Sequence, residues 1–396
     1  MKDVASHAEV LAETSTWPSS LLGEIVDVLD SKRKPITKRD RVAGPYPYYG
    51  ATGVLDMVEG YLFDEPLVLI GEDGAKWGAG DQSAFAISGK TWVNNHAHVL
   101  RPRRDRILDD WLIYYLNAAD LSEFISGMTV PKLNQGRLRE IPIPLPPLEE
   151  QKRIVAVLDQ AFAALDRARD HAEANLADAR QMQSAFVTRA IENAAEGHSS
   201  RLKLGEFCNI ARGGSPRPIK KYLTASSNGI NWIKISDASA SGQFIEVTRE
   251  KIIPEGVSRS RFVRSGAFLL TNSMSFGRPY VLNTDGCIHD GWLVLEPDYS
   301  RVEQDFLYYL LGSSQVYGNF DRLAAGSTVR NLNIGLVSNV VVTLPSVQRQ
   351  KEAVSKIAKH SKKMQALERL YDRHLADIAD LRQSLLQRAF SGQLTT

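Results

Sequence analysis

Apolar residues recur every three or four positions along two long stretches of the chain. In the first stretch they are Ile154, Leu158, Ala161, Leu165, Ala168, Ala172, Ala179, Met182 and Phe186. In the second they are Val354, Ile357, Met364, Leu367, Tyr371, Leu375, Ile378, Leu381 and Leu385. This spacing over several heptads predicts two long helices with seams of the coiled-coil type. Because one such helix cannot bury its own seam, we expect the two helices to bury each other's.

A proline-led motif precedes each seam. Leu145-Pro-Pro-Leu-Glu-Glu-Gln-Lys-Arg-Ile154 recurs as Leu344-Pro-Ser-Val-Gln-Arg-Gln-Lys351, at an offset of 199 residues (344 − 145). Proline is tolerated in the first turn of a helix but cannot extend a helix backwards, so each helix should begin just after its prolines. Ser346 is a plausible N-cap. The chain therefore contains an internal repeat.

Asn175 interrupts the first seam. One interpretation is that it lies in the seam and fixes the register of the pair, because a polar residue at a seam position does so in coiled coils. The other is that it faces solvent beside Leu176. The sequence leaves both open.

The segments before the helices predict globular domains of the α+β class. Short runs rich in Val, Ile and aromatic residues alternate with Gly, Asp and Asn turns, which is typical of strands. They include 67–71 and 92–100 in the first half and 230–236, 266–270 and 292–295 in the second. Helices are expected at 110–126 and around 306–310. The expected order is an N-terminal extension (1–16), a first domain (17–147), a first helix (148–193), a linker (194–203), a second domain (204–345) and a second helix (346–392).

The order of these parts predicts their arrangement. The shortest way for the second helix to bury its seam is to run back along the first, which gives an antiparallel coiled coil with a globular domain at each end and a rough twofold repeat. The 43 residues from Glu149 to Ile191 correspond to a spacer of roughly 65 Å, at about 1.5 Å per residue. The helices should thus hold two domains apart at a set distance.

Composition narrows the class without naming a function. The chain has 396 residues, 43% hydrophobic and 24% charged, with a formal net charge of +2, which is ordinary for a soluble globular protein. Two cysteines, Cys208 and Cys287, give no disulfide framework and fit a reducing cytosol. No apolar run approaches the length of a membrane span, so a cytoplasmic protein without membrane contact is expected.

Basic clusters in Gly- and Pro-bearing loops favour contact with nucleic acid, although a solvated surface face is the usual explanation for such clusters. Polar residues at strand ends and turns add the donors and acceptors that base edges require. In the first domain the candidates are Lys32, Arg33, Lys34, Lys38, Lys76, Asn94, Asn95, His96, Thr129, Lys132 and Asn134. In the second they are Arg212, Arg217, Lys220, Lys221, Ser273, Arg278, Ser327, Thr328, Arg330 and Asn331.

Catalytic motifs are not found in the sequence. Gly89-Lys-Thr91 resembles the end of a phosphate-binding loop, but Ala84 replaces the required first glycine and a strand-like Trp92-Val93 follows. Pro146-Pro147 is flanked by two leucines and therefore lacks the acceptor and the aromatic face of an amino-methylating loop. His96 and His98 alternate on a probable strand with no clear third ligand, so no metal site is expected.

Taken together, these features resemble the specificity subunit of Type I restriction-modification systems. The resemblance covers nearly the whole chain and rests on both proline-led motifs, Tyr48-Tyr-Gly-Ala-Thr-Gly53, Gly71-Glu-Asp-Gly74, Trp92-Val-Asn-Asn-His-Ala-His98 and Ala389-Phe-Ser-Gly-Gln-Leu394. It implies two target-recognition domains, each binding one half of an asymmetric, bipartite double-stranded DNA target. It further implies that the helices set the gap and dock two methylation subunits, which methylate adenine N6.

The resemblance also implies which chemistry lies elsewhere. S-adenosylmethionine belongs to the methylation subunits, and ATP and Mg²⁺ belong to restriction subunits, so this chain should hold no cofactor and no catalytic residue. The seam residues expected to form the coiled coil that docks the partners are Ile154, Leu158, Leu165, Phe186, Ile357, Met364, Tyr371, Ile378 and Leu385.

Three other functions remain open from the sequence. The chain could be the recognition subunit of a Type IIB enzyme or a phage-defence complex, a self-sufficient nuclease or methyltransferase, or a coiled-coil scaffold with no role on DNA. The bases recognised cannot be read from the sequence.

Overall fold

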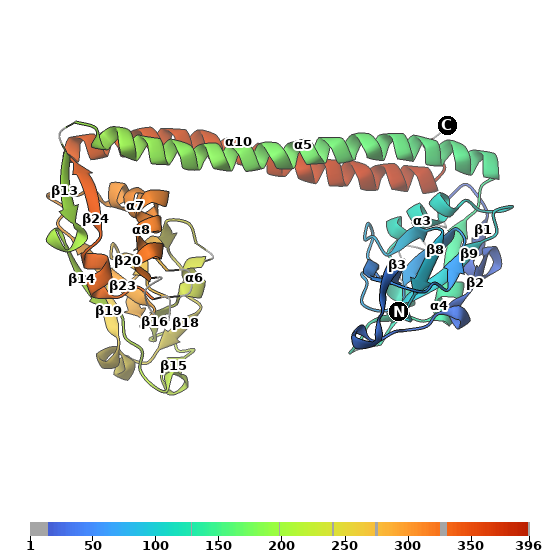
Figure 1. Ribbon diagram of the computed structural model, residues 1–396, viewed down its shortest axis with the longest axis horizontal. Coiled ribbons are helices and arrows are strands. Elements are labelled where there is room, and N and C mark those ends of the chain that lie inside the picture. Colours follow the sequence, from blue (N-terminus) through green and yellow to red (C-terminus); the bar gives the residue numbers. More distant parts are fainter. Residues whose placement is uncertain are drawn as a thin grey trace. The chain divides into compact units, whose positions relative to one another are not determined.

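The computed structural model describes residues 15–127, 129–197, 199–239, 241–273, 276–324 and 331–394. It divides into two compact units, Met1–Ala174 with Tyr371–Thr396, and Asn175–Leu370. Each unit contains one globular domain and part of the two long helices, α5 (Leu148–Ala195) and α10 (Val347–Phe390) (Figure 1). The predicted α+β class, with two globular domains and a long helix pair, is confirmed. No helix among the described residues is long and apolar enough to cross a membrane.

The first domain is built on two four-stranded sheets. The first has the order β2 (Val26–Val28), β9 (Ala97–Pro102), β6 (Leu67–Gly71) and β7 (Ala84–Ile87). The second has the order β4 (Gly53–Val58), β3 (Ala43–Gly50), β8 (Lys90–Val93) and β5 (Phe63–Asp64). Short elements complete it: β1 (Ser19–Leu21), α2 (Leu22–Ile25), η1 (Asp30–Lys32), η2 (Lys38–Asp40), η3 (Ser122–Phe124), β10 (Ile125–Ser126), β11 (Lys132–Leu133), α4 (Gln135–Arg139) and β12 (Pro142–Pro144).

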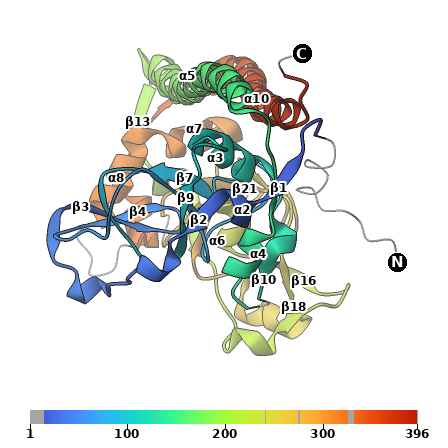
Figure 2. The ribbon, with the colours of Figure 1, turned by 90° about the vertical axis from the view of Figure 1, so that its right-hand side faces the viewer.

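Helix α3 (Asp109–Ala118) joins the first sheet to the long helices (Figure 2). Its buried face carries Trp111, whose ring lies 4.8 Å from that of Phe390 of α10, centroid to centroid, and whose indole N–H donates to the Pro144 carbonyl at 2.9 Å. The helix ends at Ala118, earlier than the predicted 126, and the chain continues into a 3₁₀ turn and strand β10.

The second domain repeats this plan with two five-stranded sheets. One has the order β14 (Cys208–Arg212), β23 (Trp292–Pro297), β20 (Phe268–Thr271), β21 (Pro279–Leu282) and β17 (Phe244–Ile245). The other has the order β15 (Leu223–Thr224), β18 (Glu250–Ile252), β16 (Ile230–Ile233), β22 (Gly286–Ile288) and β19 (Arg261–Val263). The remaining elements are η4 (Leu204–Glu206), η5 (Ile219–Lys221), α6 (Ile235–Ser239), η6 (Pro254–Arg259), α7 (Gln304–Gly312), α8 (Ser314–Ala324) and α9 (Ile334–Ser338).

A two-stranded sheet lies at the base of each domain. β1 pairs with β12 in the first domain, and β13 (Ser199–Lys203) pairs with β24 (Val341–Pro345) in the second. Part of the segment predicted to be a linker therefore forms a strand, because it pairs with the chain that leads into α10. In both domains the chain enters its long helix directly from this small sheet.

A buried glutamine fixes the first turn of each long helix to its domain. The Gln151 amide donates to the carbonyls of Pro146 and Arg106, both at 2.9 Å, and accepts from the Leu108 N–H at 2.9 Å. Gln350, at the same offset of 199 (350 − 151), donates to Pro345 and Arg301 at 2.9 Å and accepts from Glu303 at 2.8 Å. Both side chains are fully buried. Each glutamine thus satisfies three backbone groups where the helix start meets the loop before α3 or α7.

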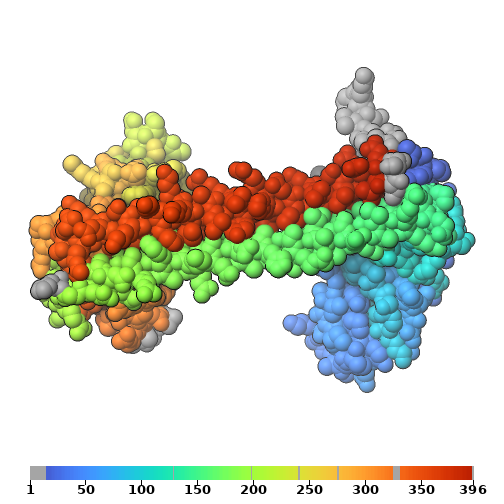
Figure 3. Space-filling model, turned by 90° about the horizontal axis from the view of Figure 1, so that it is seen from above, coloured from blue at the N-terminus to red at the C-terminus, as the bar shows by residue number. Residues whose placement is uncertain are grey.

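Within each unit the long helices pack antiparallel along their seams (Figure 3). In the first unit Arg382 of α10 binds Asp166 of α5 at 3.0 Å and lies over the Phe162 ring. In the second, the His360 ring of α10 stacks on Phe186 of α5 at a centroid distance of 3.8 Å. Nearby, Gln183 donates to the Ser361 hydroxyl at 2.6 Å and its amide oxygen lies 2.8 Å from His360 Nδ1. A polar layer of this kind fixes the register of a helix pair.

Three residues of the predicted seams are exposed instead: Ala168, Met182 and Leu381. Met182 and Leu381 are 60% and 50% exposed, and Gln183 and Arg382 take the corresponding places between the helices. The helices therefore use polar side chains where the period favoured apolar ones. Asn175 is exposed beside the buried Leu176, which settles its two interpretations in favour of solvent.

We predict that Gln350→Leu destabilises the second domain by about 2–3 kcal/mol, because three buried backbone groups lose their partner. Hydrogen exchange of the amides in the first turn of α7 should rise, while exchange in the first domain stays unchanged. Gln348→Leu is the matched control, since Gln348 lies two residues earlier and is exposed. Equal exchange in the two variants would contradict the role of the buried glutamine.

Candidate nucleic-acid interface

Three loops of the first domain meet at one edge of its sheet. They are Glu72–Gly74 after β6, Asn94–His96 between β8 and β9, and Lys132–Asn134 at β11. The Glu72 N–H donates to the His96 carbonyl at 2.8 Å, and the Leu133 N–H donates to the Glu72 carbonyl at 2.8 Å. Residues far apart in sequence are thereby brought side by side.

The basic loop after η1 lies against the same edge. The Lys34 N–H donates to the Val93 carbonyl at 3.3 Å, and the Trp92 indole N–H donates to the Lys34 carbonyl at 2.6 Å. The side chains that reach solvent here form what we call the loop face: Lys34, Asn95, His96, Lys132 and Asn134. Of the other candidates, Lys76 is exposed beyond the Gly74 turn, Thr129 is exposed between β10 and β11, and Lys32 and Lys38 are exposed on η1 and η2.

Two of the candidate DNA-binding residues, Asn94 and Arg33, bind backbone groups of the loops themselves. Asn94 is 3% exposed, and its side-chain oxygen accepts the His96 N–H at 2.8 Å, so it shapes the loop. The Arg33 side chain is 12% exposed and donates to the Ala97 carbonyl at 2.7 Å. Both are occupied by contacts within the domain, and their expected contact with DNA stays a prediction.

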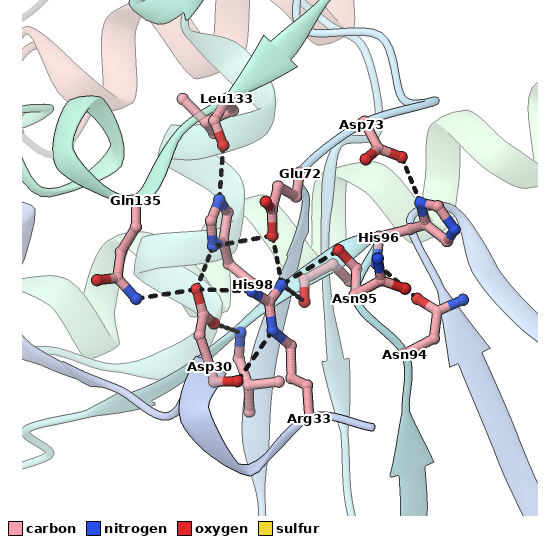
Figure 4. A network of polar contacts seen from close by, with 12 residues as sticks. Asp30, Arg33, Glu72, Asp73, Asn94, Asn95, His96, His98, Leu133 and Gln135 are labelled. Atoms are coloured by element: carbon pink, nitrogen blue, oxygen red, sulfur yellow. Dashed lines mark hydrogen bonds and ion pairs between the residues drawn. The ribbon is translucent and has the colours of Figure 1, made fainter. Parts of the chain in front are cut away.

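A buried polar cluster lies directly beneath the loop face (Figure 4). Its members, which we call the buried cluster, are Asp30, Arg33, Glu72 and His98, and Lys132 of the loop face reaches down to Glu72. The Glu72 carboxylate pairs with Lys132 Nζ at 2.7 Å and with Arg33 Nη1 at 2.5 Å. Arg33 Nη2 also lies 3.2 Å from Asp30 Oδ2. His98 Nδ1 lies 2.6 Å from Asp30 Oδ2 and 3.7 Å from Glu72 Oε2.

The cluster keeps both carboxyl groups ionised. Burial of Asp30 opposes its ionisation, but the hydrogen bond and charge of His98, the Val99 N–H and the charge of Arg33 outweigh it and lower the pKa below the usual 3.8. Burial of Glu72 is likewise outweighed by hydrogen bonds from Lys132 and Arg33, and its pKa lies below the usual 4.5. Ligand atoms of Asp30, Glu72 and His98 lie within 4.8 Å of one another, as in a metal site. Because Arg33 and Lys132 already supply positive charge there, the donor set needs no cation.

The second domain has the same backbone frame around a different polar centre. The Asn272 N–H donates to Gly291 at 3.0 Å and the Leu332 N–H donates to Asn272 at 2.8 Å, so Asn272 occupies the place of Glu72. In the strand registers, Leu270 pairs with Leu293 as Ile70 pairs with His98. An apolar leucine thus replaces the buried histidine.

Asp290 is the polar centre of the second domain. Its carboxylate accepts from the Ser215 hydroxyl at 2.6 Å and from Arg217 at 3.0 Å, and its carbonyl accepts from Arg212 at 3.0 Å and Asn272 at 2.9 Å. The Ser215 hydrogen bond is the largest cause that holds the pKa of Asp290 below its usual value.

The other candidates of the second domain lie at or near this edge. Ser273 directly follows Asn272, and Asn331 directly precedes Leu332. Arg278, Lys220 and Lys221 are exposed, the first beside β21 and the others on η5. Ser327, Thr328 and Arg330 lie outside the described residues.

The nine seam residues expected to form the docking coiled coil are all buried or half-buried. Ile154, Leu158 and Ile357 are fully buried where a long helix begins on its domain. The half-buried ones are Leu165, Phe186, Met364, Tyr371, Ile378 and Leu385.

Sequence reasoning missed the buried cluster. Asp30 and Glu72 are not among the site residues predicted from the sequence, and His98 appears there only as half of a histidine pair. The alternation of His96 and His98 on a strand does place one histidine inside and one outside. That signal identifies His98 as buried, but the approach of Asp30 depends on β2 pairing with β9.

Comparison with known proteins agrees with this architecture. A family model described as the Type I restriction modification DNA specificity domain matches residues 14–173 and 200–372. A putative type I restriction enzyme specificity subunit of Haemophilus influenzae is 28% identical over 369 residues, covering 90% of each chain. A type I restriction enzyme specificity subunit of Methanocaldococcus jannaschii is 22% identical over 374 residues, covering 86% of this chain and 85% of its own.

A solved structure shares the fold. It comes from work on the complex assembly and conformational transition of the type I R-M system, and it aligns with a TM-score of 0.74 at 19% identity. The alignment covers 96% of this chain and 98% of the other.

We predict that acid loosens the first domain through Asp30 and Glu72. Their folded-state pKa values lie below the usual ones, so their contribution to stability is complete above about pH 4.5 and is lost as the pH falls through the folded-state values. Hydrogen exchange at Ala97–Val99, corrected for the intrinsic rate, should therefore rise steeply below about pH 4.

Two variants test the cause of this acid response. Asp30→Asn should show higher exchange already at neutral pH and a smaller further rise in acid. Asp56→Asn is the control, because that carboxylate pairs with Arg41 at the surface and is largely solvated. An acid response in Asp30→Asn as steep as in the unaltered chain would contradict the assignment.

Proposed function

The chain belongs to the Type I restriction-modification DNA specificity family, and we propose that each of its globular domains binds one half of a bipartite DNA target. The observation that carries this proposal is the shared backbone frame with two different polar centres. A common frame provides a common way of lying on DNA, and different side chains provide different base preferences. The two half-sites therefore differ, and the target is asymmetric.

The loop face of the first domain has the chemistry for DNA. Lys34 and Lys132 supply positive charge for phosphates, which gives affinity that falls with salt. Asn95, Asn134 and His96 supply the donors and acceptors that distinguish base pairs in the major groove. His96 Nδ1 lies 2.5 Å from Asp73 Oδ1, and this contact orients its ring.

The second domain uses arginines in place of lysines. Arg212 and Arg217 are exposed and are oriented by Asp290, while Ser273 and Asn331 extend the same edge. Arginine in a fixed orientation can bind the O6 and N7 acceptors of guanine with two hydrogen bonds. We therefore expect the second half-site to be the more guanine-rich of the two.

The long helices serve as a spacer and as a docking surface. Their seams are filled by each other within each unit, so partners would bind their exposed, charged outer faces. The partners are methylation subunits, which bring S-adenosylmethionine and take the target adenine out of the stack to methylate N6. Restriction subunits would bring ATP and Mg²⁺. This chain supplies recognition and geometry, and no catalytic residue.

Methylome sequencing of a host that expresses this chain with its methylation subunit tests the proposal. We expect N6-methyladenine in a single motif made of two specific parts separated by a fixed number of unspecified base pairs. Cells with the methylation subunit alone are the control and should lack the motif. A continuous motif, or the same motif without this chain, would contradict the proposed function.

A further inference from the structure

His98 lies between two hydrogen-bond acceptors. Its Nδ1 is 2.6 Å from Asp30 Oδ2 and its Nε2 is 2.7 Å from the Leu133 carbonyl oxygen. A carbonyl can only accept, so Nε2 carries a proton. The ring is fully buried.

Asp30 is also placed as an acceptor. It receives the Val99 N–H at 3.0 Å, the Gln135 amide at 3.1 Å and the Arg33 guanidinium at 3.2 Å. Three donor groups around one side chain favour the carboxylate. His98 Nδ1 must therefore donate as well, which makes the ring an imidazolium.

The imidazolium connects the segments that carry the loop face. Asp30 belongs to η1, directly before the Lys34 loop, and Leu133 lies between Lys132 and Asn134. His98 itself follows the Asn94–His96 loop, whose next carbonyl, Ala97, is held by Arg33 at 2.7 Å. One charged ring thus bridges the Lys34 loop, the Asn94–His96 loop and the Lys132–Asn134 loop, whose exposed residues would meet DNA.

We propose that His98 is a positioning residue for DNA recognition by the first domain, acting as a buried imidazolium that fixes the three loops of the loop face relative to one another. This inference rests on the proposed function. It adds that base discrimination in one half-site depends on a side chain that touches no DNA. Leu293 holds the equivalent register position in the second domain, so the second half-site should not depend on such a charge.

The charged groups that face His98 are all within the same network. Asp30 from η1 and Glu72 after β6 face the ring directly. Arg33 and Lys132 bind these two carboxylates in turn. The Asp73–His96 pair lies at the rim. The two carboxylates stabilise the imidazolium, and the two cations balance the remaining charge.

Nitrogen-15 NMR of the full chain, labelled only at histidine, tests the charge directly. The chain has eight histidines, and the His98 signals are identified by their loss in His98→Leu. At neutral pH both ring nitrogens of His98 should give protonated-type shifts. In Asp30→Asn the asparagine amide can donate to Nδ1, so one nitrogen should become unprotonated. A neutral His98 in the unaltered chain would overturn the inference, whatever the DNA results.

DNA discrimination in the complex with the methylation subunits tests the role. Methylation rates are compared on the cognate target and on targets with one base pair changed in either half-site. His98→Leu should reduce discrimination in the first half-site by about tenfold, the value of one lost base contact, and leave the second half-site within about twofold. Asp30→Asn retains a bridged, neutral ring and should lose less.

Folding is followed in parallel by hydrogen exchange in β6 and β9. Normal discrimination in a folded His98→Leu variant overturns the positioning role. Should exchange show that His98→Leu unfolds the first domain, the milder Asp30→Asn decides: unchanged discrimination together with a neutral His98 ring overturns the inference, and reduced discrimination in the first half-site alone supports it. An unaltered complex that discriminates at neither half-site contradicts the proposed function itself, which keeps the two failures distinct.

Discussion

Each half of the molecule depends on how rigidly a globular domain is fixed to the start of its long helix. Gln151 and Gln350 perform this task with the same three backbone partners in each domain. A buried amide that satisfies three backbone groups is costly to remove, because each group left without a partner is penalised. The side chain therefore fixes the angle of the helix on its domain as well as the point of attachment. Without that constraint, the length of the helix would not define where its domain is held.

The two domains separate folding from recognition. The strands β2, β9, β6 and β7 and their counterparts β14, β23, β20 and β21 provide one frame, and the polar centres within it differ completely. Buried ion networks contribute little net stability compared with apolar packing. The frame of the second domain folds with Leu293 where the first has His98, so the charged cluster is not a requirement of the fold. Its value is better explained by the order it imposes on the loops above it.

The sequence was most informative where one period is sustained over many residues. The two seams and the repeated proline motif predicted the long helices, their antiparallel packing and the duplication. Which residues fill the seam was less predictable. Gln183 and Arg382 lie between the helices in place of Met182 and Leu381, because they bind side chains of the opposite helix, which the pattern of one helix cannot show. Candidate loops were found from turn residues and charge. Asp30, Glu72 and His98 were not, because they come together only when β2 and β6 pair with β9.

We propose that the helix pair holds two independent recognition domains at a set spacing. The most direct measurement is the methylated motif produced by a chain with seven residues inserted after Glu173 of α5 and seven after His374 of α10. Insertion of one heptad in each helix preserves both seams and lengthens the pair by about 10 Å, equivalent to about three base pairs of DNA. We expect the unspecified gap to lengthen by about that amount while both half-sites keep their bases. An altered half-site, or an unchanged gap in an active complex, would contradict it.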